Sequence, residues 1–125
     1  MSSVKVVAVD WFDQNSDEAV VTIADTEHAV RCFAHPVQAS VGDMVRSRLF
    51  TVGAEHVART AEPCGFRDPN GDLEWDMEFV GVVVSRLPMT VCVGDIFIEV
   101  DAPLPKDIMT GDRVHVVVER IDYVT

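Results

Sequence analysis

The sequence has little of what helical and membrane-spanning proteins are rich in. Leucine occurs only four times in 125 residues, against 24 valines. Because β-branched side chains lose freedom in helices and fit the pleated surface of a sheet, this bias argues against a helical bundle and favours strands. The chain contains no run of 18 uninterrupted apolar residues, which is the least that a membrane-spanning helix requires. We therefore expect no contact with a membrane.

Positive charge is also scarce. Ten lysines and arginines stand against 21 acidic residues, so the formal net charge is −11. Nucleic acids and anionic membranes are bound through basic surfaces, and the overall charge disfavours both as partners. Hydrophobic residues make up 48% of the chain, which is too many for a disordered acidic tail. The length suits one compact domain spanning residues 1–125.

The cysteines indicate a reducing environment. Cys32, Cys64 and Cys92 are odd in number and form no Cys-x-x-Cys motif, which is typical of free thiols in a cytoplasmic protein. The N-terminal residues also lack the apolar core of a signal peptide. Cys32 and His35 have a spacing found in zinc sites, but a strand would direct them to opposite faces. We expect a cytoplasmic protein without a metal site.

Catalytic motifs are missing from the chain. It contains no Gly-x-Ser-x-Gly elbow, no glycine-rich phosphate loop and no dinucleotide-binding fingerprint. Catalytic groups can converge from distant positions, so a missing motif lowers the expectation of an enzyme without excluding one. The sequence favours a protein that is not an enzyme and that needs no cofactor.

The chain reads as two versions of one β unit, joined by a hairpin region. We expect unit one over residues 4–52, the hairpin region over 53–78 and unit two over 79–124. Each unit has three short strand-like runs, a proline-containing connection, the motif Gly-Asp-x-Val at Gly42 or Gly111, and a last strand. The runs are residues 4–9, 19–24 and 28–33 in unit one, and 79–84, 89–94 and 96–101 in unit two.

Turn-forming residues separate these runs. Glycine permits a positive φ and aspartate bonds nearby amides, so we interpret both Gly-Asp pairs as turns without catalytic meaning. Asp68-Pro69-Asn70-Gly71 has residues that a type I turn prefers, and it predicts a hairpin between residues 64–67 and a strand that starts at Asp72. Residues 53–62 fit either two helical turns or a strand.

These features predict an all-β fold, either a small antiparallel barrel or a sandwich. The order of strands, turns and long connections is similar to that of OB-fold and SH3-like barrels. The resemblance lies in the pattern alone, and a pattern of this kind does not imply a function.

The clearest candidate site is an acidic strand over residues 72–79. Successive residues of a strand point to opposite faces, so neighbours on the same face lie about 6.6 Å apart along the strand. One face would carry four carboxylates, Asp72, Glu74, Asp76 and Glu78, and the other would carry Leu73, Trp75, Met77 and Phe79 toward the core. The acidic row is either a solvated outer face, a docking surface for a basic protein, or a cation site.

Of these three interpretations of the acidic row, we favour a docking surface for a basic protein. A small acidic protein of this kind would suit an inhibitor or an immunity-type protein that blocks a cationic nuclease or toxin. Two alternatives stay open. An OB-like module could bind single-stranded nucleic acid through Arg31, Arg46 and Arg48, and a structural module could associate with itself through exposed strand edges.

Overall fold

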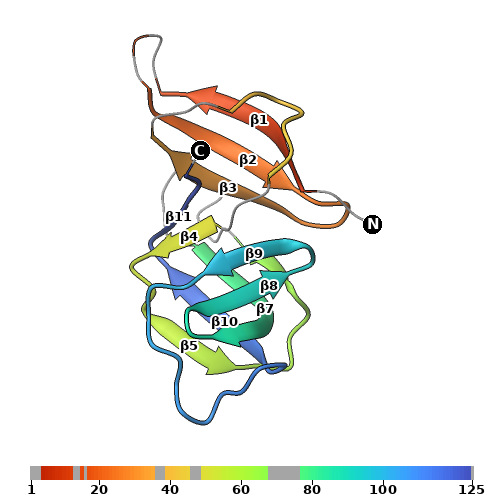
Figure 1. The fold of residues 1–125 in the computed structure, drawn as a ribbon, viewed down its shortest axis with the longest axis vertical. Coiled ribbons are helices and arrows are strands. Elements are labelled where there is room, and N and C mark those ends of the chain that lie inside the picture. The colour runs from red at the N-terminus through yellow and green to blue at the C-terminus, as the bar shows by residue number, and fades with distance from the viewer. Residues whose placement is uncertain are drawn as a thin grey trace.

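A computed structural model describes residues 4–12, 15, 17–35, 39–45, 49–67 and 77–124 of the chain. Within these ranges every regular element is a β-strand (Figure 1), so the predicted all-β class is confirmed. The eleven strands are β1 (Lys5–Trp11), β2 (Ala19–Ala24), β3 (Ala29–Ala34), β4 (Leu49–Val52), β5 (His56–Arg59), β6 (Gly65–Arg67), β7 (Met77–Arg86), β8 (Met89–Val93), β9 (Ile96–Glu99), β10 (Arg113–Val118) and β11 (Arg120–Asp122).

The strands form where apolar residues alternate with polar or smaller ones. In β10, Val114, Val116 and Val118 are buried, whereas His115 and Val117 are only half-buried. The same alternation in β3 buries Val30, Cys32 and Ala34. Buried side chains from both halves of the chain join in a single hydrophobic cluster. One core therefore lies under the whole sheet.

The described strands form one mixed sheet in the order β1-β2-β3-β11-β4-β9-β8-β7-β10-β5, with β6 paired to β7. The order has a symmetry, because β3, β2 and β1 follow outward from β11, and β9, β8 and β7 follow outward from β4. The last strand of each predicted unit therefore lies against the third strand of the other unit. Figure 1 shows β4 and β11 side by side between the two halves.

The expected antiparallel barrel or sandwich is not confirmed. β11 runs parallel to β3, and β4 runs parallel to β9, so the sheet is mixed. The described strands also do not close into a barrel. The reason is that β4 follows the long connection after β3 and pairs in parallel with β9 of the other half, and that β11 follows directly after β10 and pairs in parallel with β3.

The two Gly-Asp turns are built alike. Gly42 donates its N–H to the carbonyl of Val6 at 2.7 Å, and Gly111 donates to the carbonyl of Val83 at 2.8 Å. A second hydrogen bond runs in the opposite direction in each turn: the backbone carbonyls of Asp43 and Asp112 accept from the N–H groups of Val6 and Val83. Both glycines have a φ of 98°, a conformation that strains residues with a side chain.

Each turn also faces a β-bulge. The pairing of β1 with β2 shifts register between Val6 and Ala8, and the pairing of β7 with β8 shifts between Val83 and Ser85. A bulge adds one residue to a strand and bends it. Corresponding segments of the two halves thus share both a turn and a bulge.

The hairpin region is partly described. Residues 56–59 of the ambiguous segment form strand β5, which pairs with β10, so the strand alternative holds for these residues. β6 pairs antiparallel with β7, as expected for residues 64–67 and the following strand, but the register sets Arg67 opposite Glu78, further along the chain than the expected strand start at Asp72. The predicted turn, Asp68–Gly71, lies outside the described residues.

Candidate functional site

Only the end of the predicted acidic strand lies within the described residues. Met77 and Phe79 are buried, with Glu78 half-buried between them, which is the predicted alternation. Asp72, Glu74 and Asp76 lie outside the described residues, together with Leu73 and Trp75 of the expected core face. Glu78 is therefore the part of the candidate site for which side-chain contacts can be stated.

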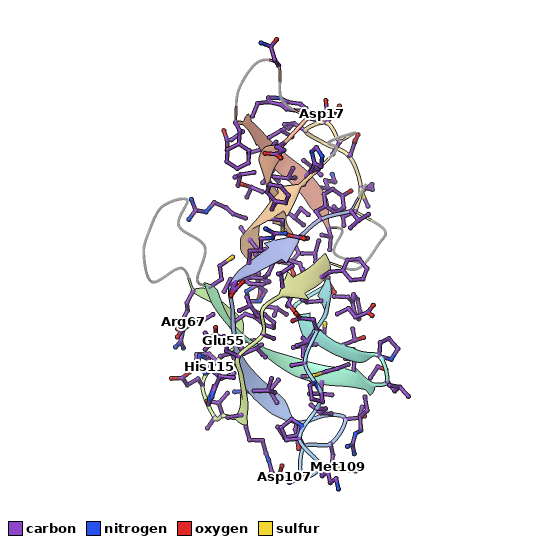
Figure 2. The ribbon with its side chains drawn as sticks, turned by 90° about the vertical axis from the view of Figure 1, so that its left-hand side faces the viewer. Asp17, Glu55, Arg67, Asp107, Met109 and His115 are labelled. Carbon is purple, nitrogen blue, oxygen red and sulfur yellow. The ribbon has the colours of Figure 1, made fainter. Side chains whose placement is uncertain are left out.

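Glu78 belongs to a cluster of titratable side chains on β5, β6, β7 and β10. Its carboxylate Oε1 lies 3.8 Å from Nε2 of His115, and the imidazole of His115 meets that of His56 edge to face, with ring centroids 5.6 Å apart. Arg67, opposite Glu78, forms an ion pair with Glu62 at 3.2 Å. Figure 2 shows Glu55, Arg67 and His115 at the same side of the molecule.

Arg31, the described member of the alternative nucleic-acid site, lies half-buried on β3. Phe33 follows two residues later on the same face, and its ring centroid lies 6.2 Å from that of Phe12. The guanidinium of Arg120 covers Phe33 at 4.9 Å, and its Nε donates to Asp122 at 2.8 Å. Arg46 and Arg48 lie outside the described residues.

Sequence reasoning missed Arg120 and Asp122, because only the parallel pairing of β11 with β3 brings them to Phe33. No local motif marks a contact between residues 33 and 120. Phe97 is exposed on β9. Phe50, on the neighbouring strand β4, is partly exposed as well. Aromatic side chains are thus available at the surface of these two strands.

Most of the described arginines are held by contacts within the chain. Arg59 pairs with Asp107 at 2.9 Å, and Arg113 donates to the carbonyl of Glu62 at 2.8 Å. Arg67 and Arg120 pair with neighbouring carboxylates, as described above. Because most of these arginines contact carboxylates or carbonyls of the same chain, the excess of negative charge is left at the surface.

Two acidic side chains have structural roles instead. Asp25 accepts the N–H groups of Glu27, His28 and Asp95 at 2.6–2.9 Å. Partial burial by itself would raise the pKa of Asp25, but these amide hydrogen bonds outweigh it and lower the pKa. The carboxylate thereby ties the β2–β3 turn to the β8–β9 turn.

Asp101 makes a similar set of contacts after β9. It accepts the hydroxyl of Thr51 at 2.7 Å and the N–H groups of Gly53 and Ala54. Burial again opposes the charge, and the hydrogen bonds lower the pKa of Asp101 overall. This carboxylate holds the bend between β4 and β5.

The thiols of Cys32 and Cys92 are not activated as nucleophiles. Cys32 is fully buried in β3, and desolvation, with a smaller effect of the Asp122 charge, raises its pKa far above the usual range. Desolvation and the nearby Asp95 raise the pKa of Cys92 as well. A reactive cysteine needs a lowered pKa, so these two residues are packing side chains.

Among the described residues, no three His, Cys, Asp or Glu side chains gather in a way that could hold a metal ion. No helix in the described ranges is long and apolar enough to cross a membrane. A comparison with known families finds no family model that matches the chain, and comparisons with curated proteins and with solved structures find no significant match.

Proposed function

We propose that the chain is a non-enzymatic binding protein that engages a basic protein partner through its acidic surface. The observation that carries this proposal is the distribution of charge. The chain has a net charge of −11, and Arg59, Arg67 and Arg120 are already paired with its own carboxylates. The remaining acidic groups have few internal cations to balance them, so a basic partner would do so.

The acidic strand is the centre of the proposed surface, with Asp72, Glu74, Asp76 and Glu78 as contact residues. Complementary charge would steer the partner during its approach. Charge-assisted hydrogen bonds from lysine or arginine would then hold it. The inhibitor or immunity-type role against a cationic nuclease or toxin is the form of this function that suits a small acidic domain.

The test compares two variants with equal charge change. In the first, Asp72→Asn, Glu74→Gln, Asp76→Asn and Glu78→Gln are combined. In the control, four exposed acids elsewhere are neutralised, by Asp17→Asn, Glu27→Gln, Asp95→Asn and Glu119→Gln. Each protein is immobilised and used to capture partners from host cells at low and high salt.

We expect a basic protein on the wild type and on the control, released by salt and absent from the first variant. Association of the purified pair should slow at least tenfold in the first variant, because steering depends on local charge. Equal capture by both variants would contradict the assignment of the acidic strand. Capture of acidic or neutral proteins alone would contradict the function.

A second candidate function is supported by the surroundings of Arg31. Phe33 shares its face of β3, and the ring lies between Phe12 and the Arg120 guanidinium. Aromatic rings next to arginines are the usual platform for single-stranded nucleic acid. A titration with fluorescent single-stranded DNA and RNA at low salt tests this OB-like role, and Arg31→Ala with Phe33→Ala should weaken any binding at least tenfold.

A further inference from the structure

The described residues at the two ends of the long axis of the molecule differ in charge. Figure 2 places Asp17 at one end of this axis and Asp107 with Met109 at the other. Both ends carry large apolar side chains that are open to solvent. Exposed apolar groups flanked by charge are typical of protein contact surfaces.

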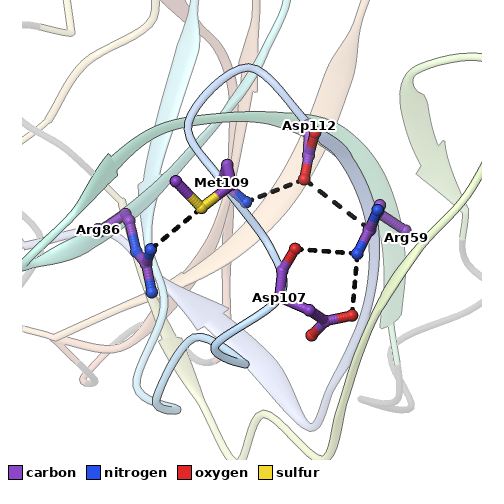
Figure 3. A network of polar contacts seen from close by, with 5 residues as sticks. All are labelled: Arg59, Arg86, Asp107, Met109 and Asp112. Carbon is purple, nitrogen blue, oxygen red and sulfur yellow. Dashed lines mark hydrogen bonds and ion pairs between the residues drawn. The ribbon is translucent and has the colours of Figure 1, made fainter.

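We name the lower one the basic end and define it by Arg59, Arg86, Leu87, Lys106 and Met109. Leu87, in the turn between β7 and β8, is 93% exposed, and Met109 is 55% exposed. Figure 3 shows that the end of β7 contacts the loop before β10, because Nη1 of Arg86 donates to the sulfur of Met109 at 3.4 Å.

The acidic groups at the basic end are already engaged. Nη2 of Arg59 lies 2.9 Å from Oδ2 of Asp107, and its Nε lies 3.8 Å from Asp112 (Figure 3). Asp112 also accepts the N–H of Met109. The three cations Arg59, Arg86 and Lys106 outnumber these two acids. This end is therefore locally positive in a chain whose net charge is −11.

The opposite end, which we name the acidic end, consists of Asp10, Trp11, Phe12, Asp17 and Glu18. Trp11 is 51% exposed and Phe12 is 46% exposed. Asp10 and Asp17 are exposed beside them. The N–H of Phe12 donates to the carbonyl of Glu18 at 3.1 Å, which holds the aromatic and acidic residues together.

We propose that the chain associates with itself head to tail, with the acidic end of one copy on the basic end of the next. The two ends are complementary in charge, and each offers apolar area that the contact would remove from water. Aromatic residues, methionine and arginine are the types enriched in such interfaces. Because each copy uses two different surfaces, the contact is heterologous and leaves one end of every dimer open.

Other surfaces fit a second copy less well. The terminal strand β5 has only four residues and exposes His56 and Arg59, which protects that edge from pairing. The proposal is independent of the acidic strand, because none of its residues belongs to either end. Failure of one proposal therefore leaves the other unaffected.

The first experiment is sedimentation velocity of the full chain from about ten to several hundred micromolar, at low and at high salt. We expect the weight-average sedimentation coefficient to rise with concentration at low salt and to fall toward the monomer value at high salt, since screening weakens contacts between exposed charges. A monomer at every concentration would overturn the proposal.

The second experiment separates a head-to-tail contact from a symmetric one. Trp11→Lys disables the acidic end, because it replaces apolar area with a charge that the basic end repels, and Leu87→Glu disables the basic end in the same way. Each variant alone should be monomeric, whereas an equimolar mixture should form a 1:1 dimer, because the mixture still contains one intact end of each kind. Circular dichroism of each variant checks that the fold is kept, and Lys106→Glu serves as a second, milder change at the basic end.

The matched control is Phe97→Glu, which places the same charge as Leu87→Glu on an exposed aromatic position of β9, away from both ends. It should associate like the wild type. Association of either single variant at wild-type strength would overturn the proposal. A mixture that stays monomeric, or an equal loss in the Phe97→Glu control, would overturn it as well.

Discussion

The carboxylate of Asp25 accepts a hydrogen bond from the backbone N–H of Asp95 at 2.9 Å, although 70 residues separate the two. The contact joins the β2–β3 turn of the first half to the β8–β9 turn of the second half. The two turns also pack closely against each other, because a Cβ placed on Gly94 would collide with the same carboxylate and with the ring of His28. One side chain thus couples the two hairpins.

Removal of this carboxylate should destabilise the whole fold. Asp25→Ala leaves the N–H groups of Glu27, His28 and Asp95 without their acceptor, and we expect a loss of about 2 kcal/mol in the free energy of unfolding. Urea denaturation followed by tryptophan fluorescence measures it. Glu27→Ala, an exposed neighbour, is the control and should change stability by less than about 0.5 kcal/mol. Equal losses in the two variants would contradict the role of Asp25.

The same carboxylates predict acid sensitivity. Hydrogen bonds lower the pKa of Asp25 and of Asp101 in the folded state, despite partial burial. The stability that they contribute is therefore present above the ordinary aspartate pKa of about 4 and is lost as the pH falls toward their lower folded-state values. Unfolding free energies measured from pH 6 to pH 3 should fall less steeply for Asp25→Asn with Asp101→Asn than for the wild type. A parallel curve for the double variant would refute this.

The Gly-Asp turns predict a positional effect of alanine. Gly42 and Gly111 have a φ of 98°, so Gly42→Ala and Gly111→Ala should each cost about 1–2 kcal/mol through backbone strain. Neither glycine has an atom within 4 Å of the added Cβ, and neither does Gly65, whose φ is not positive. Gly65→Ala is therefore the matched control, and thermal unfolding should leave it close to the wild type. A similar loss at all three positions would show that strain is not the cause.

Thiol labelling checks the packing of the cysteines. Cys32 is buried with a raised pKa, whereas Cys64 and Cys92 are partly exposed. A colorimetric thiol reagent at pH 8 should therefore label two thiols of the native protein and all three after denaturation. Because its pKa is also raised, Cys92 should react slowly for an accessible thiol. Rapid labelling of Cys32 in the native protein would contradict the structure.

The sequence predicts local structure well because strand patterns and turns are local signals. The predicted run at residues 19–24 coincides with β2, and the run at 89–94 differs from β8 by one residue. Each run is rich in β-branched residues and lies next to turn-forming residues, and nothing distant is needed to recognise it. The single last strand expected after the motif at Gly111 is interrupted at Glu119, which separates β10 from β11.

The arrangement of the strands could not be read in the same way. Parallel pairing of β4 with β9 and of β11 with β3 joins segments that lie far apart in the sequence, and no local pattern records it. The contacts of the candidate site likewise could not all be predicted from local patterns. The alternation around Glu78 was predictable, but its neighbour His115 comes from β10 and is brought there by the register of β10 with β7.

The exchange of β4 and β11 between the halves also governs how the protein is made. β11 lies between β3 and β4 and consists of residues 120–122, so the first-half sheet lacks an interior strand until residues 120–122 have been synthesised. Long-range pairing of this kind slows folding and leaves edges exposed in the meantime. During synthesis, the facing edges of β3 and β4 therefore stay unpaired until these three residues become available.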